Sequence, residues 1–321
     1  MENLFVGNRQ ALYSSLENNS LVFLYASERK LRNGDIYYPY RQDSNFFFLS
    51  GIEQFHSILL LYKSAKGEIT EYLFLYQPLK KEIIYDSGFL TNKEAQDISG
   101  IDTVLPIDHF ERIWKDIMDK DPVVYIQPLS GAFEHHLFLK GTHELLKKRY
   151  PTTHIKSIIP LVEQLRLIKS DEEIERIKTA ISITKKTLFD VVKLIKSQAT
   201  ERQIAAFLLY NYYQYPHTSY AFDPIVATGK NACVLHYNQL LNTLSKNDLV
   251  LIDTGAEYQN YAADITRVFP VNGKFTSQQK DLYQAVLDVQ QRAISLFVKG
   301  ATINTINKTV NLWMFDTLVD L

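Results

Sequence analysis

Short hydrophobic runs separated by polar turns mark the first half of the chain. Four of these runs are rich in β-branched and aromatic side chains and are bounded by turn-forming residues: 21–26, 57–63, 71–77 and 122–128. Such runs are typical of strands. Helical patterns over 93–97 and 109–118 lie between them. This alternation predicts an α/β fold with mixed strand pairing.

A long helical pattern dominates after a stretch punctuated by Pro151 and Pro160. Apolar residues then recur at three- and four-residue steps from Ile174 to Ile195, which predicts an amphipathic helix with these residues in one apolar stripe. We therefore place a domain boundary near residue 158, with an N-terminal domain over 1–158 and a second domain over 159–321.

The second half continues with strand patterns enclosed by helical ones. Four strands are predicted, over 224–227, 232–237, 249–254 and 262–270. A helix is predicted over 201–213, and another begins after the capping pair Thr276 and Gln279. The final stripe, from Ile303 to Leu321, is also helical and reaches the last residue without a stop signal.

The charge balance and the single cysteine exclude several kinds of protein and of metal site. Lys plus Arg is 35 and Asp plus Glu is 36, a net charge of −1 that lacks the basic footprint of nucleic-acid binders. Cys233, the one cysteine, excludes an internal disulfide and a zinc site built on several thiolates. No signal-peptide pattern and no run long enough to span a membrane is present, so we expect a cytoplasmic protein with no membrane partner.

Two aspartates flank a predicted hairpin. Asp253 ends an apolar strand, Asp264 lies in the next predicted strand, and Gln259-Asn260 is the natural turn between them. A two-residue turn at this point sets Asp253 opposite Thr266 and puts both carboxylates on one face, about 7–8 Å apart. An odd-numbered loop would put them on opposite faces.

Two carboxylates on one face repel, and a shared cation relieves the repulsion. Their hard oxygen ligands suit manganese, magnesium or calcium. On spacing alone, the reading in which Asp253 is a turn residue and Asp264 a solvated one is favoured, because aspartates are common in hairpins. The Asp-Thr-Gly triplet beginning at Asp253 also resembles the aspartic-protease motif, but the chain has no second copy and the predicted fold is rich in helices.

The histidines offer further candidates. His236 lies in an apolar predicted strand next to the Asp253 strand, where it is either a site residue or a structural histidine. Cys233 would point to the opposite face of that strand, which argues against a Cys–His dyad and favours packing for Cys233. His135 and His136, with His143 nearby, are predicted to be surface residues.

Three segments together resemble the Xaa-Pro aminopeptidases (aminopeptidase P), in the wider group of creatinase, prolidase and methionine aminopeptidase. They are residues 38–52, 165–184 and 219–276. The resemblance implies an α/β (α+β) protein: a creatinase-like N-terminal α/β domain followed by the first half of a "pita-bread" catalytic domain.

The resemblance also implies a site and a reaction. Two divalent metal ions, usually manganese (Mn2+), are held by five side chains, of which Asp253 and Asp264 match the first two, with Asp264 bridging the ions. His236 matches a catalytic histidine that contacts the substrate. A metal-bridging hydroxide attacks the peptide carbonyl and releases an N-terminal residue that precedes proline. The implied partners are a peptide with proline at its second position and further copies of the chain, in a dimer or tetramer.

The remaining ligands of the family are a histidine and two glutamates from the second half of the catalytic domain. The chain has no histidine after His236, so it contains two of the five expected ligands and is expected to be truncated at the C-terminus. Two hypotheses follow: a shortened form of a working enzyme, or a non-catalytic module that binds peptides or proteins. Either way, we expect apolar residues of 249–252 and of the final stripe to be exposed.

Overall fold

A computed structural model of the chain describes residues 3–319 and 321. Its contacts divide the chain into two compact units, Met1–Glu172 and Glu173–Leu321. This division falls later than the predicted residue 158, because Ile158 and Val162 are buried in the core of the first unit.

A six-stranded sheet forms the centre of the first unit, in the order β6-β5-β4-β1-β7-β8. The strands are β1 Ser20–Tyr25, β4 Ile58–Lys63, β5 Ile69–Leu75, β6 Val104–Pro106, β7 Val123–Ile126 and β8 Ile155–Ser157. The β4 strand is antiparallel to both neighbours, β1 and β5, whereas the other pairs are parallel. The predicted strands and their mixed pairing are confirmed.

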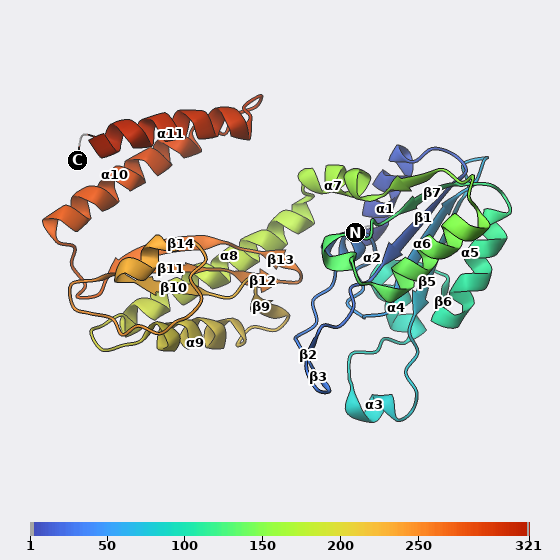
Figure 1. Cartoon of the computed structure of the whole chain (residues 1–321), viewed down its shortest axis with the longest axis horizontal. Helices are drawn as coiled ribbons and strands as arrows, with labels where there is room; N and C mark the ends of the chain where they lie inside the picture. The colour runs from blue at the N-terminus through green and yellow to red at the C-terminus, as the bar shows by residue number, and fades with distance from the viewer. Residues whose placement is uncertain (1–2, 320) are drawn as a thin grey trace. The chain divides into compact units, whose positions relative to one another are not determined.

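Helices cover both faces of this sheet (Figure 1), which explains why every residue of β1 is buried. The helices α1 Leu4–Ser15, α2 Ser44–Ser50, α4 Asn92–Ser99 and α7 Ile159–Leu167 contribute to one core, and α5 Phe110–Met118 and α6 Leu137–Arg149 to the other. The unit also contains the hairpin β2 Leu31–Asn33 and β3 Ile36–Tyr37, the helix α3 Glu82–Tyr85, and the short turns η1 Ile107–His109 and η2 Gly131–Phe133. The predicted helices over 93–97 and 109–118 correspond to α4 and α5.

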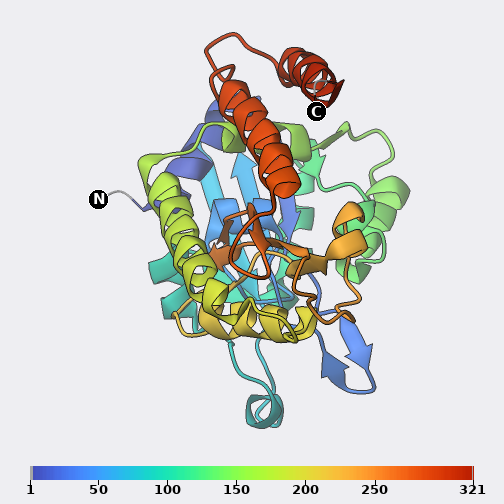
Figure 2. The same cartoon turned by 90° about the vertical axis from the view of Figure 1, so that its left-hand side faces the viewer.

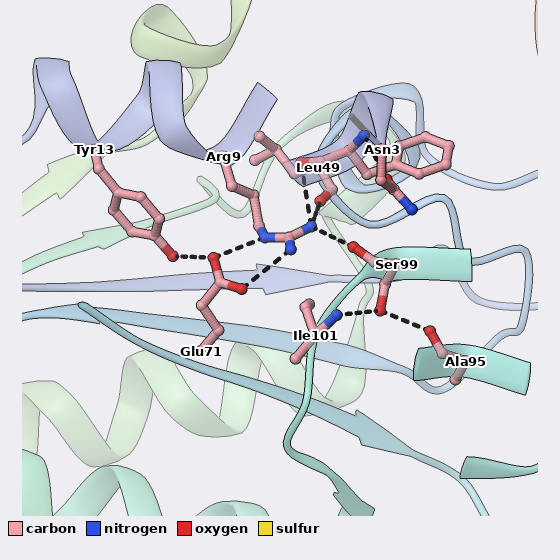
Figure 3. Close-up of polar contacts among 9 residues, drawn as sticks. Asn3, Arg9, Tyr13, Leu49, Glu71, Ala95, Ser99 and Ile101 are labelled. Atoms are coloured by element: carbon pink, nitrogen blue, oxygen red, sulfur yellow. Dashed lines mark hydrogen bonds and ion pairs between the residues drawn. The ribbon is translucent and has the colours of Figure 1, made fainter. Parts of the chain in front are cut away.

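A buried ion pair joins α1 to the sheet (Figure 3). The Arg9 side chain is 1% exposed and donates from Nε and Nη2 to the Glu71 carboxylate, at 2.8 and 3.1 Å. The Tyr13 hydroxyl donates to the same carboxylate at 2.7 Å. Three backbone carbonyls accept from Nη1 of Arg9: those of Phe5, Leu49 and Ser99. One guanidinium thus ties α1, α2, α4 and β5 together.

The described residues of the second unit form two three-stranded sheets and four longer helices. One sheet has the order β10-β11-β14 (Ile225–Thr228, Leu249–Thr254, Ile265–Pro270), and the other β13-β12-β9 (Tyr261–Ala262, Ala256–Tyr258, Thr218–Tyr220). The helices are α8 Asp171–Val191, α9 Glu201–Tyr212, α10 Ser277–Ile294 and α11 Ile303–Val319, with the short turns η3 Val192–Leu194 and η4 Gly229–Cys233. Apolar residues of α8 and α9 pack with β10 and β11 in one core. Figure 2 shows α10 and α11 joined by a short connection.

Two predictions for this unit are wrong and a third holds only in part. No strand forms over 232–237, where η4 and a turn take its place. The predicted strand 262–270 is interrupted at residues 263–264. The predicted apolar stripe of α8 is buried only in part: Leu188 and Val191 are buried, whereas Ile174 and Ile181 are exposed. Thr184 lies on the buried side instead, where its hydroxyl accepts the Ala256 backbone N–H at 2.8 Å.

The expected exposure of apolar residues holds in one place only. In β11, Val250 and Ile252 are buried, which contradicts the expectation for these two residues, whereas Leu249 and Leu251 are half-buried. In α11, Leu312 and Phe315 are both 66% exposed, as expected for the final stripe. No helix among the described residues combines the length and apolar character needed to cross a membrane.

Candidate metal centre

The hairpin that follows Asp253 has the predicted geometry. Gln259 and Asn260 have φ of 47° and 66°, the left-handed pair that a two-residue type I′ turn requires. The β12 and β13 strands pair across this turn. In the adjoining β11–β14 pair, Asp253 lies opposite Thr266. The predicted turn and register are confirmed.

Gly255 lets two backbone segments cross at close range next to the hairpin. A Cβ atom at position 255 would lie 1.7 Å from the Ala263 carbonyl oxygen, which no side chain tolerates. The crossing interrupts the second strand, so Asp264 lies just before β14 and not in the middle of a strand as predicted. The glycine of the Asp-Thr-Gly triplet therefore has a packing role here.

One cavity of about 370 Å³ brings the three predicted site residues together. It is lined by Phe222, Asp223, Ile225, His236, Tyr237, Asn238, Asp253 and Asp264. Asp223, a further lining residue, is not among the predicted site residues. The signal was present, since Asp223 lies two residues before Ile225, the first residue of β10, which pairs directly with Asp253.

The two aspartates are electrostatically unsatisfied. Partial desolvation, the negative charge of Asp253 and a hydrogen bond between the two side chains raise the pKa of the exposed Asp264 above its usual range. The Oδ1 atom of Asp253 is buried and finds no hydrogen-bond partner among the residues that the structure describes. A bound cation would relieve the repulsion and coordinate the buried oxygen, so the donor set fits a hard divalent ion.

The described residues offer few candidate ligands for a metal ion. Within residues 3–319 and 321, no group of three or more His, Cys, Asp or Glu residues is placed to hold a metal ion. Asp253 and Asp264 are therefore the two candidate ligands that this part of the chain brings together.

His236 reaches the cavity from a turn after η4 and is exposed, so its predicted place on a strand is wrong. Cys233 is also exposed, which contradicts the packing role predicted for it. Neither Cys233 nor His236 lies on a strand, so the alternation of strand side chains does not separate them.

Of the three histidines predicted to lie on the surface, His135 is exposed, His143 is half-buried and His136 is buried, so the prediction is wrong for His136. His136 is 4% exposed, with Nε2 at 2.9 Å from the Ala26 carbonyl and Nδ1 accepting the Leu139 backbone N–H. The side chain thus caps α6, a role that the sequence analysis missed. His143 bonds the Gln127 carbonyl at 2.9 Å, and His135 is exposed as predicted.

Comparison with known proteins identifies the family. The model described as "Aminopeptidase P, N-terminal domain" matches residues 5–125, and the model described as "Metallopeptidase family M24" matches residues 175–316. A Xaa-Pro aminopeptidase of Haemophilus influenzae is 32% identical over 99% of this chain and 72% of its own length. The Xaa-Pro aminopeptidase of Escherichia coli is 30% identical over 99% of this chain and 73% of its own length.

Solved structures agree with the sequence comparison. Proline aminopeptidase P II from Yersinia pestis matches with a TM-score of 0.90 and 29% identity, over 99% of this chain and 74% of the other. Escherichia coli aminopeptidase P with the inhibitor Pro-Leu matches with a TM-score of 0.90 and 29% identity, over 99% and 73%. The expected α/β class is therefore correct, and the chain belongs to the Xaa-Pro aminopeptidase family and is a metallo-aminopeptidase.

Proposed function

We propose that the chain releases the N-terminal residue of peptides whose second residue is proline, with divalent cations, manganese foremost, held by Asp253 and Asp264. The observation that carries the metal assignment is the pair of neighbouring carboxylates, one with a raised pKa and the other with a buried, unpartnered oxygen. When bound, divalent cations polarise the scissile carbonyl and lower the pKa of the attacking water.

The residues around the aspartates would bind and orient the peptide. An N–H group of the His236 ring would donate a hydrogen bond to the carbonyl oxygen as it gains negative charge, which stabilises the transition state more than the substrate. Phe222 and Ile225 line the same cavity and offer apolar surface for a proline ring. The role of His236 rests on its place in the cavity with both aspartates.

Two measurements test this proposal separately. Equilibrium dialysis measures manganese binding to the chain and to the Asp264→Ala variant, with Asp288→Ala as the control, since Asp288 is an exposed carboxylate of α10. We expect Asp264→Ala to abolish manganese binding and the control to retain it. Unchanged metal stoichiometry in Asp264→Ala would overturn the ligand assignment.

The second measurement is release of the N-terminal residue from an Xaa-Pro peptide, with manganese or with a chelator. Turnover that the chelator stops supports the activity. No turnover in a folded sample that binds manganese would contradict it. A non-catalytic binding module is not favoured, because the matched relatives are named as aminopeptidases. The proposed dimer or tetramer and the proposed cytoplasmic location are checked by light scattering and by cell fractionation.

A further inference from the structure

The loop that carries His236 has little hydrophobic anchoring. This His236 loop, residues 229–242, connects β10 to the segment that pairs with the start of α9. Tyr237 is its one buried residue, and positions 233–236 are all exposed. A solvent-facing loop of this kind needs polar anchors if His236 is to stay in the cavity.

A single buried carboxylate supplies these anchors. Glu201, the first residue of α9, is 0% exposed, and it is not needed as a cap because Thr200 and Gln203 already form the capping box. Four donors from the His236 loop and its ends converge on its two oxygens. They are the backbone N–H of Thr228 (2.9 Å), Nδ2 of Asn231 (3.1 Å), the hydroxyl of Tyr237 (2.8 Å) and the backbone N–H of Asn242 (2.9 Å).

The distribution of these donors requires a carboxylate. Oε1 of Glu201 accepts the backbone N–H of Thr228, at one end of the loop, and Oε2 accepts that of Asn242, at the other end. A backbone N–H can only donate, so both oxygens must act as acceptors. A glutamine at position 201 presents one acceptor oxygen and an NH2 group that only donates, so it must lose its hydrogen bond to one end of the loop.

We infer that Glu201 is a positioning residue for His236. Its carboxylate holds both ends of the His236 loop and the side chain of Tyr237, the neighbour of His236, so that His236 faces the two aspartates. The inference rests on the proposed role of His236 in the aminopeptidase reaction. Glu201 is not among the residues that line the cavity, so it acts on His236 through the loop.

Hydrogen exchange of the whole chain tests the anchoring without any assay of activity. In Glu201→Gln we expect amides of 229–242 to exchange about tenfold faster or more, while the amides of β11 keep their wild-type rates. Tyr237→Phe removes one donor to Glu201 and keeps the ring, so it should increase the exchange rates of 229–242 by less. This variant also tests the anchoring if Glu201→Gln does not fold. Glu173→Gln is the matched control, because Glu173 is also buried and accepts a tyrosine hydroxyl, that of Tyr261.

Peptide turnover then tests the consequence for the reaction. In the manganese-loaded chain, Glu201→Gln should lower kcat, leave metal stoichiometry unchanged and add nothing to the loss caused by His236→Ala in the double variant. Wild-type exchange rates in 229–242, uniform acceleration across the second unit, or fully additive losses of kcat would overturn the inference. If the wild-type chain shows no turnover, the aminopeptidase proposal fails, and the exchange rates alone decide whether Glu201 holds the loop.

Discussion

Replacing Glu71 by alanine would leave the buried guanidinium of Arg9 without its counter-ion. The variant removes the acceptor for Nε and Nη2 of Arg9 and for the Tyr13 hydroxyl. The backbone carbonyls bonded to Nη1 stay in place, but they carry no compensating charge. We therefore expect a large loss of stability in the first unit.

The magnitude follows from burial. Breaking a buried pair by removing one partner costs about 3–5 kcal/mol. Arg9 is 1% exposed but Glu71 is 22% exposed, so water reaches part of the vacated site and the expected cost lies near the lower limit, about 3 kcal/mol. For a unit of this size, that corresponds to a fall in Tm of about 6–12 °C.

Tryptophan fluorescence can isolate the first unit. The chain has two tryptophans. Trp114 is buried in the first unit, whereas Trp313 belongs to α11 of the second. In a Trp313→Phe background, thermal unfolding followed by Trp114 fluorescence reports on the first unit alone.

Two controls accompany Glu71→Ala. Asp97→Ala breaks an exposed pair with Lys93 and should change stability by less than about 0.5 kcal/mol. The double variant Arg9→Met with Glu71→Met removes both charges and should be more stable than Glu71→Ala. A fall in Tm of Glu71→Ala no larger than that of Asp97→Ala would refute the reasoning.

Three further predictions concern the second unit. Gly255→Ala should cost about 3 kcal/mol in thermal unfolding, because its Cβ would overlap the Ala263 carbonyl, and an unchanged Tm would contradict the close crossing. Asp264→Asn should raise the Tm of the metal-free chain at neutral pH. Because the pKa of Asp264 is raised in the folded chain, folding favours its protonated form, and the gain in Tm should vanish as the pH falls below the usual aspartate pKa. A gain in Tm that persists in acid would exclude repulsion from Asp253 as the cause. Thr276→Ala should destabilise α10 by about 1 kcal/mol, measured by urea unfolding against Thr276→Ser, which keeps the capping hydroxyl.

Short sequence patterns predict those features that depend only on neighbouring residues, such as turns, strand register and helix starts. The two-residue turn at Gln259-Asn260 fixes the pairing of Asp253 with Thr266, so the proximity of the carboxylates could be predicted without any structure. The capping box of Thr276 likewise marks the start of α10 in both sequence and structure.

Contacts between distant residues determine the rest. Residues 232–237 have the apolar character of a strand, yet Glu201 draws the surrounding segment into a loop through hydrogen bonds to residues more than twenty positions away. The buried face of α8 was predicted only in part for a similar reason, since Thr184 faces inward to bond the backbone of β12. Hydrophobic periodicity does not contain such polar contacts.

The two edges of the six-stranded sheet are its shortest strands. The β6 and β8 strands have three residues each, whereas the β1 strand between them has six. Pro106 offers β6 no N–H for a further strand, and β8 carries Lys156, whose Nζ lies 2.6 Å from Glu17. Brief, interrupted edges of this kind are poor templates for strand addition, so the unit is protected against the edge-to-edge growth that leads to amyloid-like aggregates.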